Sequence, residues 1–291
     1  MRREIDIWRI SSISNFLELL EKLQFQFGQS QRGSSFIFRG MANTDWSLLP
    51  SIFREERRFI DENEILHHFR KESSGLLPNM KSCDSFTWLQ YAQHYGVPTR
   101  LLDFTENPLC ALYFSCISND EKDGCLWILN VHSYHRWTIS VAESNLERVS
   151  YTKNDFIKSI LDSEVRGCEV REEIKRFIEK PIFFIPEYID QRMSAQSSRF
   201  LLWGTKGVSL EEMMQPEHFM KVSSDGVRFE IANDERFILK VEISTSCKND
   251  IIQQLDILGI NEKTLFPGLD SIGRYIGKRY RYNRDIHSDY L

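Results

Sequence analysis

The chain has 291 residues, of which 41% are hydrophobic, so it can form one large domain or two small domains with a substantial core. Its 37 basic and 42 acidic residues give a formal net charge of −5. The chain as a whole therefore lacks the positive net charge that would attract nucleic acid. The longest nearly apolar run, residues 109–117, is too short to span a bilayer, which takes about 20 residues. We therefore expect a soluble, cytoplasmic protein without a membrane partner.

The first half of the chain predicts a compact region of strands and helices. The dipeptide Asn107-Pro108 is typical of a helix start, because Asn caps a helix and Pro fits its first turn. The helix that follows is apolar nearly all round, which predicts that it is buried. Apolar spacing predicts helices over residues 16–23, 61–72, 86–95 and 109–117, and strands over residues 35–39, 100–104 and 125–131.

The second half begins with residues 140–180, which are charged and helix-prone, so we expect a helical insertion there. Strands are expected again at Phe183 and over residues 200–203 and 237–243. A helix over residues 248–258, ended by Gly259, precedes a last helix through Ile272 and Ile276. Helices and strands are mixed without regular βαβ alternation, so the expected fold is α+β, with a mixed, mostly antiparallel sheet and flanking helices.

The six cysteines are scattered and include no CxxC pair, which argues against a disulfide framework or a zinc site. Cys110 and Cys116 fall in the predicted buried helix, where a thiol behaves as a small hydrophobic group. The histidines at 67–68 and at 132 and 135 have no companion ligands at zinc-like spacing. The sequence therefore predicts reduced thiols and no metal site.

Charged side chains interrupt the most hydrophobic part of the chain, residues 36–117. Burying a charge is costly unless the charge is paired or used. Arg39, His94, Arg100 and Asp103 are therefore candidate site residues. The alternative for Arg39 and Asp103 is a buried structural ion pair, and the alternative for His94 is a core histidine at a helix end.

Four ordered motifs resemble the FRG domain family, which is named after its Phe-Arg-Gly tripeptide and occurs widely in bacteria and their phages. The resemblance spans about residues 30–277 and implies a single domain over residues 1–291, with residues 274–291 as a basic, aromatic tail. The motifs are Phe38-Arg39-Gly40 with Trp46-Ser47-Leu48-Leu49-Pro50, residues 92–105, Gln191-Arg192 with Ala195-Gln196 and Phe200, and Thr264-Leu265-Phe266-Pro267-Gly268-Leu269-Asp270.

A more distant resemblance is to arginine-type ADP-ribosyltransferases. These enzymes carry an aromatic-Arg-Gly on the first strand of the NAD site, and a Ser-Thr-Ser strand that leads into an Asn-Pro-headed apolar helix. Phe38-Arg39-Gly40 and residues 103–114 have that order. The resemblance implies an ADP-ribosyltransferase-like core with NAD as substrate, in which Arg39 and Gly40 hold the pyrophosphate and Thr105 lies beside the nicotinamide ribose.

The transferases also carry a Glu on a later strand, which orients the nicotinamide ribose. The comparable region of this chain has Arg192 and Gln196, with no Glu between them. Cleavage of a glycosidic bond passes through an oxocarbenium-like state that a nearby carboxylate stabilises. Asp103 and Glu106 are the candidate carboxylates and His94 a candidate base, with Arg100, Arg192 and Gln196 as further NAD ligands.

These features lead to a first hypothesis of an ADP-ribosyltransferase-like or NAD-cleaving enzyme, acting as a bacterial toxin or anti-phage effector on an unknown protein or nucleic-acid acceptor. A second hypothesis is a non-catalytic module that senses a nucleotide in the same pocket. A third is nucleic-acid binding through the Arg- and Tyr-rich residues 274–284, which alternatively form a solvated helix end.

Overall fold

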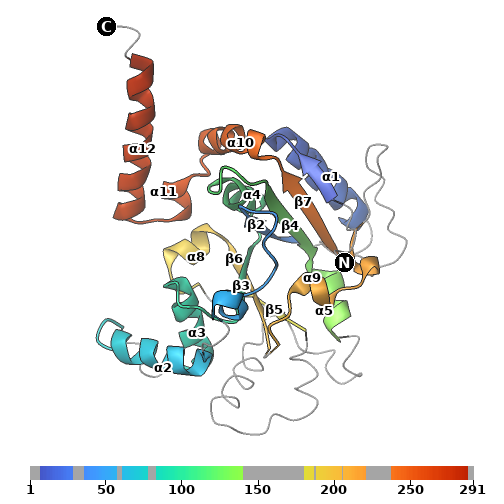
Figure 1. The fold of residues 1–291 in the computed structure, drawn as a ribbon, viewed down its shortest axis with the longest axis vertical. Coiled ribbons are helices and arrows are strands. Elements are labelled where there is room, and N and C mark those ends of the chain that lie inside the picture. The colour runs from blue at the N-terminus through green and yellow to red at the C-terminus, as the bar shows by residue number, and fades with distance from the viewer. Residues whose placement is uncertain are drawn as a thin grey trace.

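The computed structural model describes residues 7–28, 36–57, 61–77, 83–139, 180–186, 188–204, 206–220 and 237–287. One curled sheet forms the centre of the molecule, and helices cover it (Figure 1). The expected α+β class is confirmed. The helical insertion expected over residues 140–180 lies, except for Lys180, outside the described residues.

The sheet is mixed and mostly antiparallel, as expected. Each neighbouring pair runs antiparallel except the first, which is parallel. The first strand was not predicted, because it is short and begins only at residue 7. In spatial order the strands are β1 (Ile7–Ile10), β7 (Ile238–Ile243), β4 (Gly124–Asn130), β2 (Phe36–Met41), β3 (Leu101–Thr105), β6 (Ser198–Leu202) and β5 (Ile182–Phe184).

The described helices include each one predicted outside the insertion, and several run further than their apolar spacing indicated. α12 continues to His287, so most of the expected C-terminal tail is helical. α5, which was not predicted, follows β4 without a loop. The helices are α1 (Ile13–Gly28), α2 (Glu62–Ser73), α3 (Ser85–His94), α4 (Pro108–Cys116), α5 (Val131–Ile139), α8 (Gln191–Ala195), α9 (Leu210–Met213), α10 (Thr245–Ile257), α11 (Glu262–Leu265) and α12 (Leu269–His287).

Side-chain caps determine where three helices begin. The Asn107 side chain accepts hydrogen bonds from the backbone N–H groups of Leu109 (3.0 Å) and Cys110 (3.2 Å), which confirms the predicted start of α4. Asp84 caps α3 and Asp190 caps α8 in the same way. These caps satisfy backbone N–H groups at the starts of three helices that border the region between β2 and β3. The starts of those helices are therefore well defined.

Two glycines let α4 lie directly on the sheet. A Cβ atom at Gly40 would be 1.8 Å from the carbonyl oxygen of Ala111, and one at Gly124 would be 2.2 Å from that of Ser115. The Ser115 hydroxyl also donates to the carbonyl of Cys125 (3.0 Å), so a side chain of α4 is hydrogen-bonded to the backbone of β4. The glycine of the Phe-Arg-Gly motif is therefore required for helix-to-strand packing.

The sheet opens between β2 and β3. β2 pairs with β4 along its whole length and β3 pairs with β6 along its whole length, whereas β2 and β3 are in register only at Phe38 and Thr105. Beyond that pair, a side chain replaces the backbone pairing, because Arg39 Nη1 donates to the backbone carbonyl of Asp103 at 2.5 Å. The opening leaves room for a site between the two halves of the sheet.

We expect Gly40→Ala to lower the free energy of unfolding by about 3 kcal/mol or more, because the added methyl group meets rigid helix backbone. Gly277→Ala in α12 is the matched control, since no atom lies within 4 Å of the added Cβ, and alanine there should raise stability by about 0.5–1 kcal/mol. Urea unfolding of both variants measures the difference. Equal effects of the two substitutions would contradict this role of Gly40.

Candidate functional site

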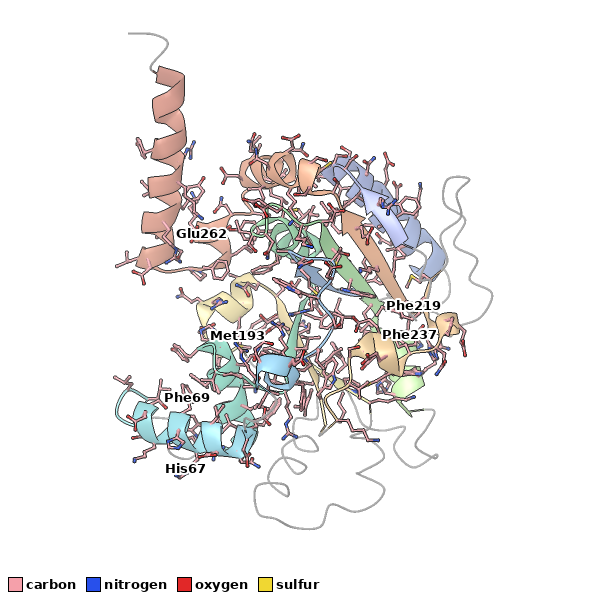
Figure 2. The ribbon with its side chains drawn as sticks, in the orientation of Figure 1. His67, Phe69, Met193, Phe219, Phe237 and Glu262 are labelled. Atoms are coloured by element: carbon pink, nitrogen blue, oxygen red, sulfur yellow. The ribbon has the colours of Figure 1, made fainter. Side chains whose placement is uncertain are left out.

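A pocket of about 270 Å³ lies at the opening between β2 and β3. α4 forms one wall over β2. α3 and α8 form the other, packed on β3 and β6 through Leu89, Met193 and Phe200 (Figure 2 marks Met193 on α8). Segments far apart in the sequence therefore meet at one place. The pocket brings together seven of the nine predicted site residues: Arg39, Gly40, His94, Asp103, Thr105, Arg192 and Gln196.

Arg39 bridges the opening, and it has no carboxylate partner in the part of the chain that the structure describes. Its guanidinium donates to the main-chain carbonyl of Asp103, so the expected alternative of an Arg39–Asp103 side-chain ion pair is not what the geometry shows. Burial lowers the pKa of Arg39, and the negative charge of Asp103 opposes that shift. Its Nε is buried, and among the described residues it has no hydrogen-bond partner. A buried donor of this kind costs about 1–3 kcal/mol unless something accepts its hydrogen bond.

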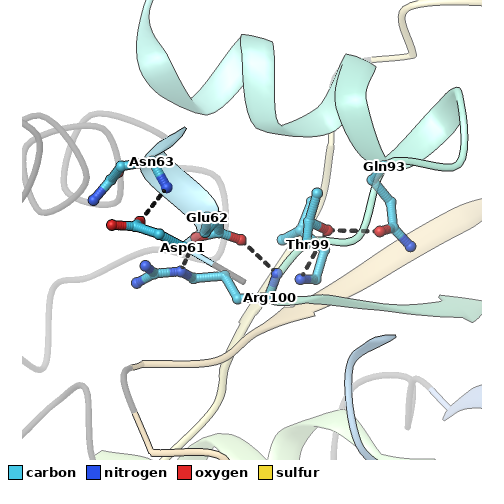
Figure 3. Close-up of polar contacts among 7 residues, drawn as sticks. Asp61, Glu62, Asn63, Gln93, Thr99 and Arg100 are labelled. Carbon is cyan, nitrogen blue, oxygen red and sulfur yellow. Dashed lines mark hydrogen bonds and ion pairs between the residues drawn. The ribbon is translucent and has the colours of Figure 1, made fainter. Parts of the chain in front are cut away.

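Asp103 presents an oriented carboxylate to the pocket. Its Oδ2 accepts a hydrogen bond from Gln93 Nε2 at 2.6 Å, and Gln93 Oε1 accepts one from the Thr99 hydroxyl at 2.6 Å (Figure 3 shows Gln93 and Thr99). Because a carboxylate only accepts, Asp103 determines that the NH2 end of the Gln93 amide faces it, and the Thr99 hydroxyl then donates to the other end. Among the described residues that line the pocket, Asp103 is the only carboxylate.

His94 contacts Asp190, which also caps α8. The His94 Nε2 lies against one oxygen of Asp190, and the other oxygen accepts from the backbone N–H of Met193 at 2.8 Å. Burial lowers the pKa of His94, the Asp190 carboxylate opposes this shift, and Arg192 adds to it. The lowered pKa favours the neutral imidazole, whose single N–H faces Asp190, so the other ring nitrogen can accept a hydrogen bond in the pocket.

Thr105 and Gln196 join the walls of the pocket. The Thr105 hydroxyl donates to the carbonyl of Gln196 (2.5 Å) and accepts from the N–H of Asn107 (2.9 Å). The Gln196 side chain donates to the carbonyl of Leu265 (3.0 Å). Both side chains line the pocket, yet these bonds tie β3, α8 and α11 to one another.

Arg192 rests on an aromatic ring at the edge of the pocket. Its guanidinium carbon lies 4.7 Å from the ring centroid of Phe266, and the Phe114 ring packs edge-on against Phe266 with centroids 5.9 Å apart. In the described part of the chain Arg192 has no carboxylate within ion-pair distance. Two guanidinium groups, Arg39 and Arg192, thus face a pocket with one carboxylate, which favours an anionic ligand.

Two predicted site residues lie outside the pocket lining, and both are already paired. The Arg100 backbone N–H donates to Glu62 Oε1 at 2.6 Å and its side chain contacts Oε2, with side-chain exposures of 11% and 8% (Figure 3). Glu106 pairs with Arg199 at 2.6 Å. Arg100 and Glu106 form ion pairs here, with partners that lie 38 and 93 residues away in the sequence, and their roles at the site stay predictions.

Several functional residues were not found from the sequence. Asp190 stands just before Gln191-Arg192 and fits the N-cap pattern, so a cap search would have found it. Gln93 and Phe266 lie inside the motifs that resemble the FRG family, but their contacts depend on tertiary neighbours, so the motifs alone did not indicate their roles. Cys110 also lines the pocket, but burial raises the pKa of its thiol to about 12, so it stays protonated and is a poor nucleophile.

Comparison with known families finds a match that covers part of the chain. The family model of the FRG domain matches residues 34–124. The chain contains an FRG domain. The matched segment supplies both strands of the opening and therefore Arg39, His94, Asp103 and Thr105, whereas Arg192 and Gln196 come from beyond it. Searches of curated proteins and of solved structures found no match.

The described residues also bear on metals and membranes. Within the ranges that the structure describes, no group of three or more His, Cys, Asp or Glu side chains is placed to hold a metal ion. None of the helices in those ranges has both the length and the apolar character needed to cross a membrane.

We expect Glu62→Gln to lower the free energy of unfolding by about 3 kcal/mol, because it leaves the Arg100 guanidinium buried without its anionic partner. Arg9→Gln is the control, since Arg9 is 81% exposed in its pair with Glu242 and should change stability by less than about 1 kcal/mol. Chemical denaturation compares the two variants. A Glu62→Gln protein as stable as the control would show that Arg100 is not held as a buried pair.

We expect acidification to destabilise the protein through His94. In the unfolded chain a histidine takes up a proton near pH 6.5, whereas in the folded protein its pKa is lower, so the unfolded state binds more protons between the two values. Stability should fall as the pH drops through about 6.5 towards the lowered pKa, and the fall should be smaller in His94→Gln. Unfolding free energies measured against pH test this. Parallel profiles for the two proteins would contradict it.

Proposed function

We propose that the FRG domain pocket binds NAD and promotes cleavage of its nicotinamide–ribose bond, in an ADP-ribosyltransferase-like or NAD glycohydrolase reaction. The observation that carries the proposal is the pairing of two guanidinium groups with one oriented carboxylate in a single pocket. A ligand that carries both an anionic group and a sugar fits this combination of two guanidinium groups and one carboxylate. The acceptor of the ADP-ribose would be water or a macromolecule.

The two arginines suit a pyrophosphate. The Arg39 Nε is buried and has no hydrogen-bond partner among the described residues, and the Arg192 guanidinium carbon lies 4.7 Å from the ring centroid of Phe266. A planar guanidinium meets phosphate oxygens with paired, charge-assisted hydrogen bonds. The pocket volume of about 270 Å³ is near the lower end of the roughly 300–1,000 Å³ usual for ligand sites, so one half of a dinucleotide would be enclosed and the other would extend past the rim.

Asp103 suits the reacting ribose. As the glycosidic bond breaks, the nicotinamide nitrogen keeps the electron pair and leaves as a neutral molecule, and positive charge develops on the ribose. A fixed carboxylate stabilises that charge more in the transition state than in the ground state. Neutral His94 can hydrogen-bond a ribose hydroxyl beside it. The acceptor then adds to the ribose carbon and releases its proton to solvent.

The same pocket also supports a second candidate, a non-catalytic nucleotide sensor. Glu106 is paired with Arg199, and Asp103 is the remaining carboxylate, with one oxygen already hydrogen-bonded to Gln93. A sensor would bind NAD or ADP-ribose tightly and release no nicotinamide. Depletion of NAD by the enzyme, on the other hand, would fit a toxin or an anti-phage effector.

The test is to incubate the purified protein with NAD and follow free nicotinamide. We expect Arg39→Lys and Arg192→Ala each to raise KM by about tenfold or more, since a hydrogen bond to a charged group contributes about 1.5–3 kcal/mol. Asp103→Asn should lower kcat by about 100-fold with little change in NAD affinity. Arg9→Ala, far from the pocket on β1, is the matched control and should leave both constants unchanged.

The outcomes separate the candidates. NAD binding that depends on Arg192, without nicotinamide release, would favour the sensor. Absence of NAD binding in a wild-type protein that unfolds cooperatively would contradict both. Arg39→Lys is preferred to Arg39→Ala because the longer side chain can keep a hydrogen bond to the Asp103 carbonyl.

A further inference from the structure

The C-terminal segment concentrates apolar side chains that face solvent. Of the thirteen large hydrophobic side chains that are exposed in the described chain, six lie between residues 257 and 280. Exposed apolar surface gathered in one region usually marks an interface. The six residues, with their exposed fractions, are Ile257 (86%), Leu258 (56%), Leu269 (87%), Ile272 (41%), Ile276 (47%) and Tyr280 (69%).

Four of these residues form a stripe along α12. Leu269, Ile272, Ile276 and Tyr280 are spaced three and four residues apart, so they lie on one face of the helix. α12 extends away from the sheet and joins the body through α11 (Figure 1). With 19 residues the helix is about 28 Å long.

The opposite face of α12 is fastened to the body. Arg274 and Lys278 pair with Glu262 of α11 at 2.5 and 2.8 Å, at the point that Figure 2 labels. The Tyr275 hydroxyl donates to Asp256 of α10 at 2.9 Å. These bonds determine the orientation of the helix, so the apolar stripe is turned outward.

The net charges of α12 and of the rest of the chain indicate which partner covers the apolar stripe. The sequence of α12 contains five basic and two acidic residues, a formal charge of +3, while the whole chain carries −5, so the remainder carries −8. Two α12 helices laid against each other would repel. A phosphate backbone would be repelled by the acidic body and would leave the apolar stripe uncovered. A second copy offers a net acidic body for the basic helix and further exposed apolar side chains, such as Ile257 and Leu258, for the stripe.

We propose that α12 is a dimerisation arm, which packs its apolar stripe on the acidic body of a second copy while the partner's arm does the same in return. The exposed apolar pair at the end of α10 extends the contact surface beside the arm. The stripe from Leu269 to Tyr280 is about 17 Å long, so strips about 10 Å wide on each side of two reciprocal contacts give about 680 Å², the size of a weak interface. A two-fold symmetric contact of this kind uses the arms of both copies, so assembly stops at a dimer.

The test is the mass of the full chain in solution, measured by light scattering and sedimentation over a range of protein and salt concentrations. We expect a dimer whose Kd rises with salt, because attraction between the arm and the body is partly electrostatic. Ile276→Glu should raise the Kd by about tenfold or more. Arg279→Glu, a second variant on an exposed position of α12, should weaken the dimer in the same direction.

Leu17→Glu is the matched control, since Leu17 is 51% exposed on α1 and outside the arm. It should leave the dimer unchanged. A wild-type protein that is monomeric at every concentration would overturn the proposal, as would equal loss of dimer in Leu17→Glu and Ile276→Glu. A monomer that binds duplex or single-stranded oligonucleotides through Arg279 would also overturn it. None of these readouts depends on NAD binding.

Discussion

The hydrogen bond from Arg39 to the Asp103 carbonyl is the interaction on which the rest of the site depends. Where β2 and β3 separate, the Asp103 carbonyl has no strand partner on β2, and the Arg39 guanidinium donates to it instead. The guanidinium supplies that bond from the side, which lets the sheet stay open. The same side chain then stands at the mouth of the pocket with its Nε unpartnered among the described residues. Arg39 is thus both a residue that bridges the opening in the sheet and a candidate ligand-binding residue.

Specific packing contacts and side-chain caps hold the helices around this opening. Gly40 and Gly124 bring α4 onto the strands, and side-chain caps hold the starts of α3, α4 and α8. Phe266 links Phe114 and Arg192 at the rim. The pocket therefore needs the region beyond the matched FRG segment, since α8 and β6 complete its wall.

Local patterns predicted most of the fold, because apolar periodicity and caps are properties of neighbouring residues. Asn107-Pro108 marked α4, and the polar residues set into apolar runs marked Arg39, His94 and Asp103. The partners of Arg100 and Glu106 could not be predicted in this way. Glu62 lies on α2 and Arg199 on β6, so each pairing depends on how distant elements pack. β1 was missed because four residues are too few to show a period.

The most direct measurement of the central claim is a crystal structure of the protein with NAD or its product ADP-ribose. The account predicts the pyrophosphate within hydrogen-bonding distance of Arg39 and Arg192, and the nicotinamide-side ribose beside Asp103 and His94. A nucleotide bound elsewhere, or bound here with the pyrophosphate away from both guanidinium groups, would contradict the account.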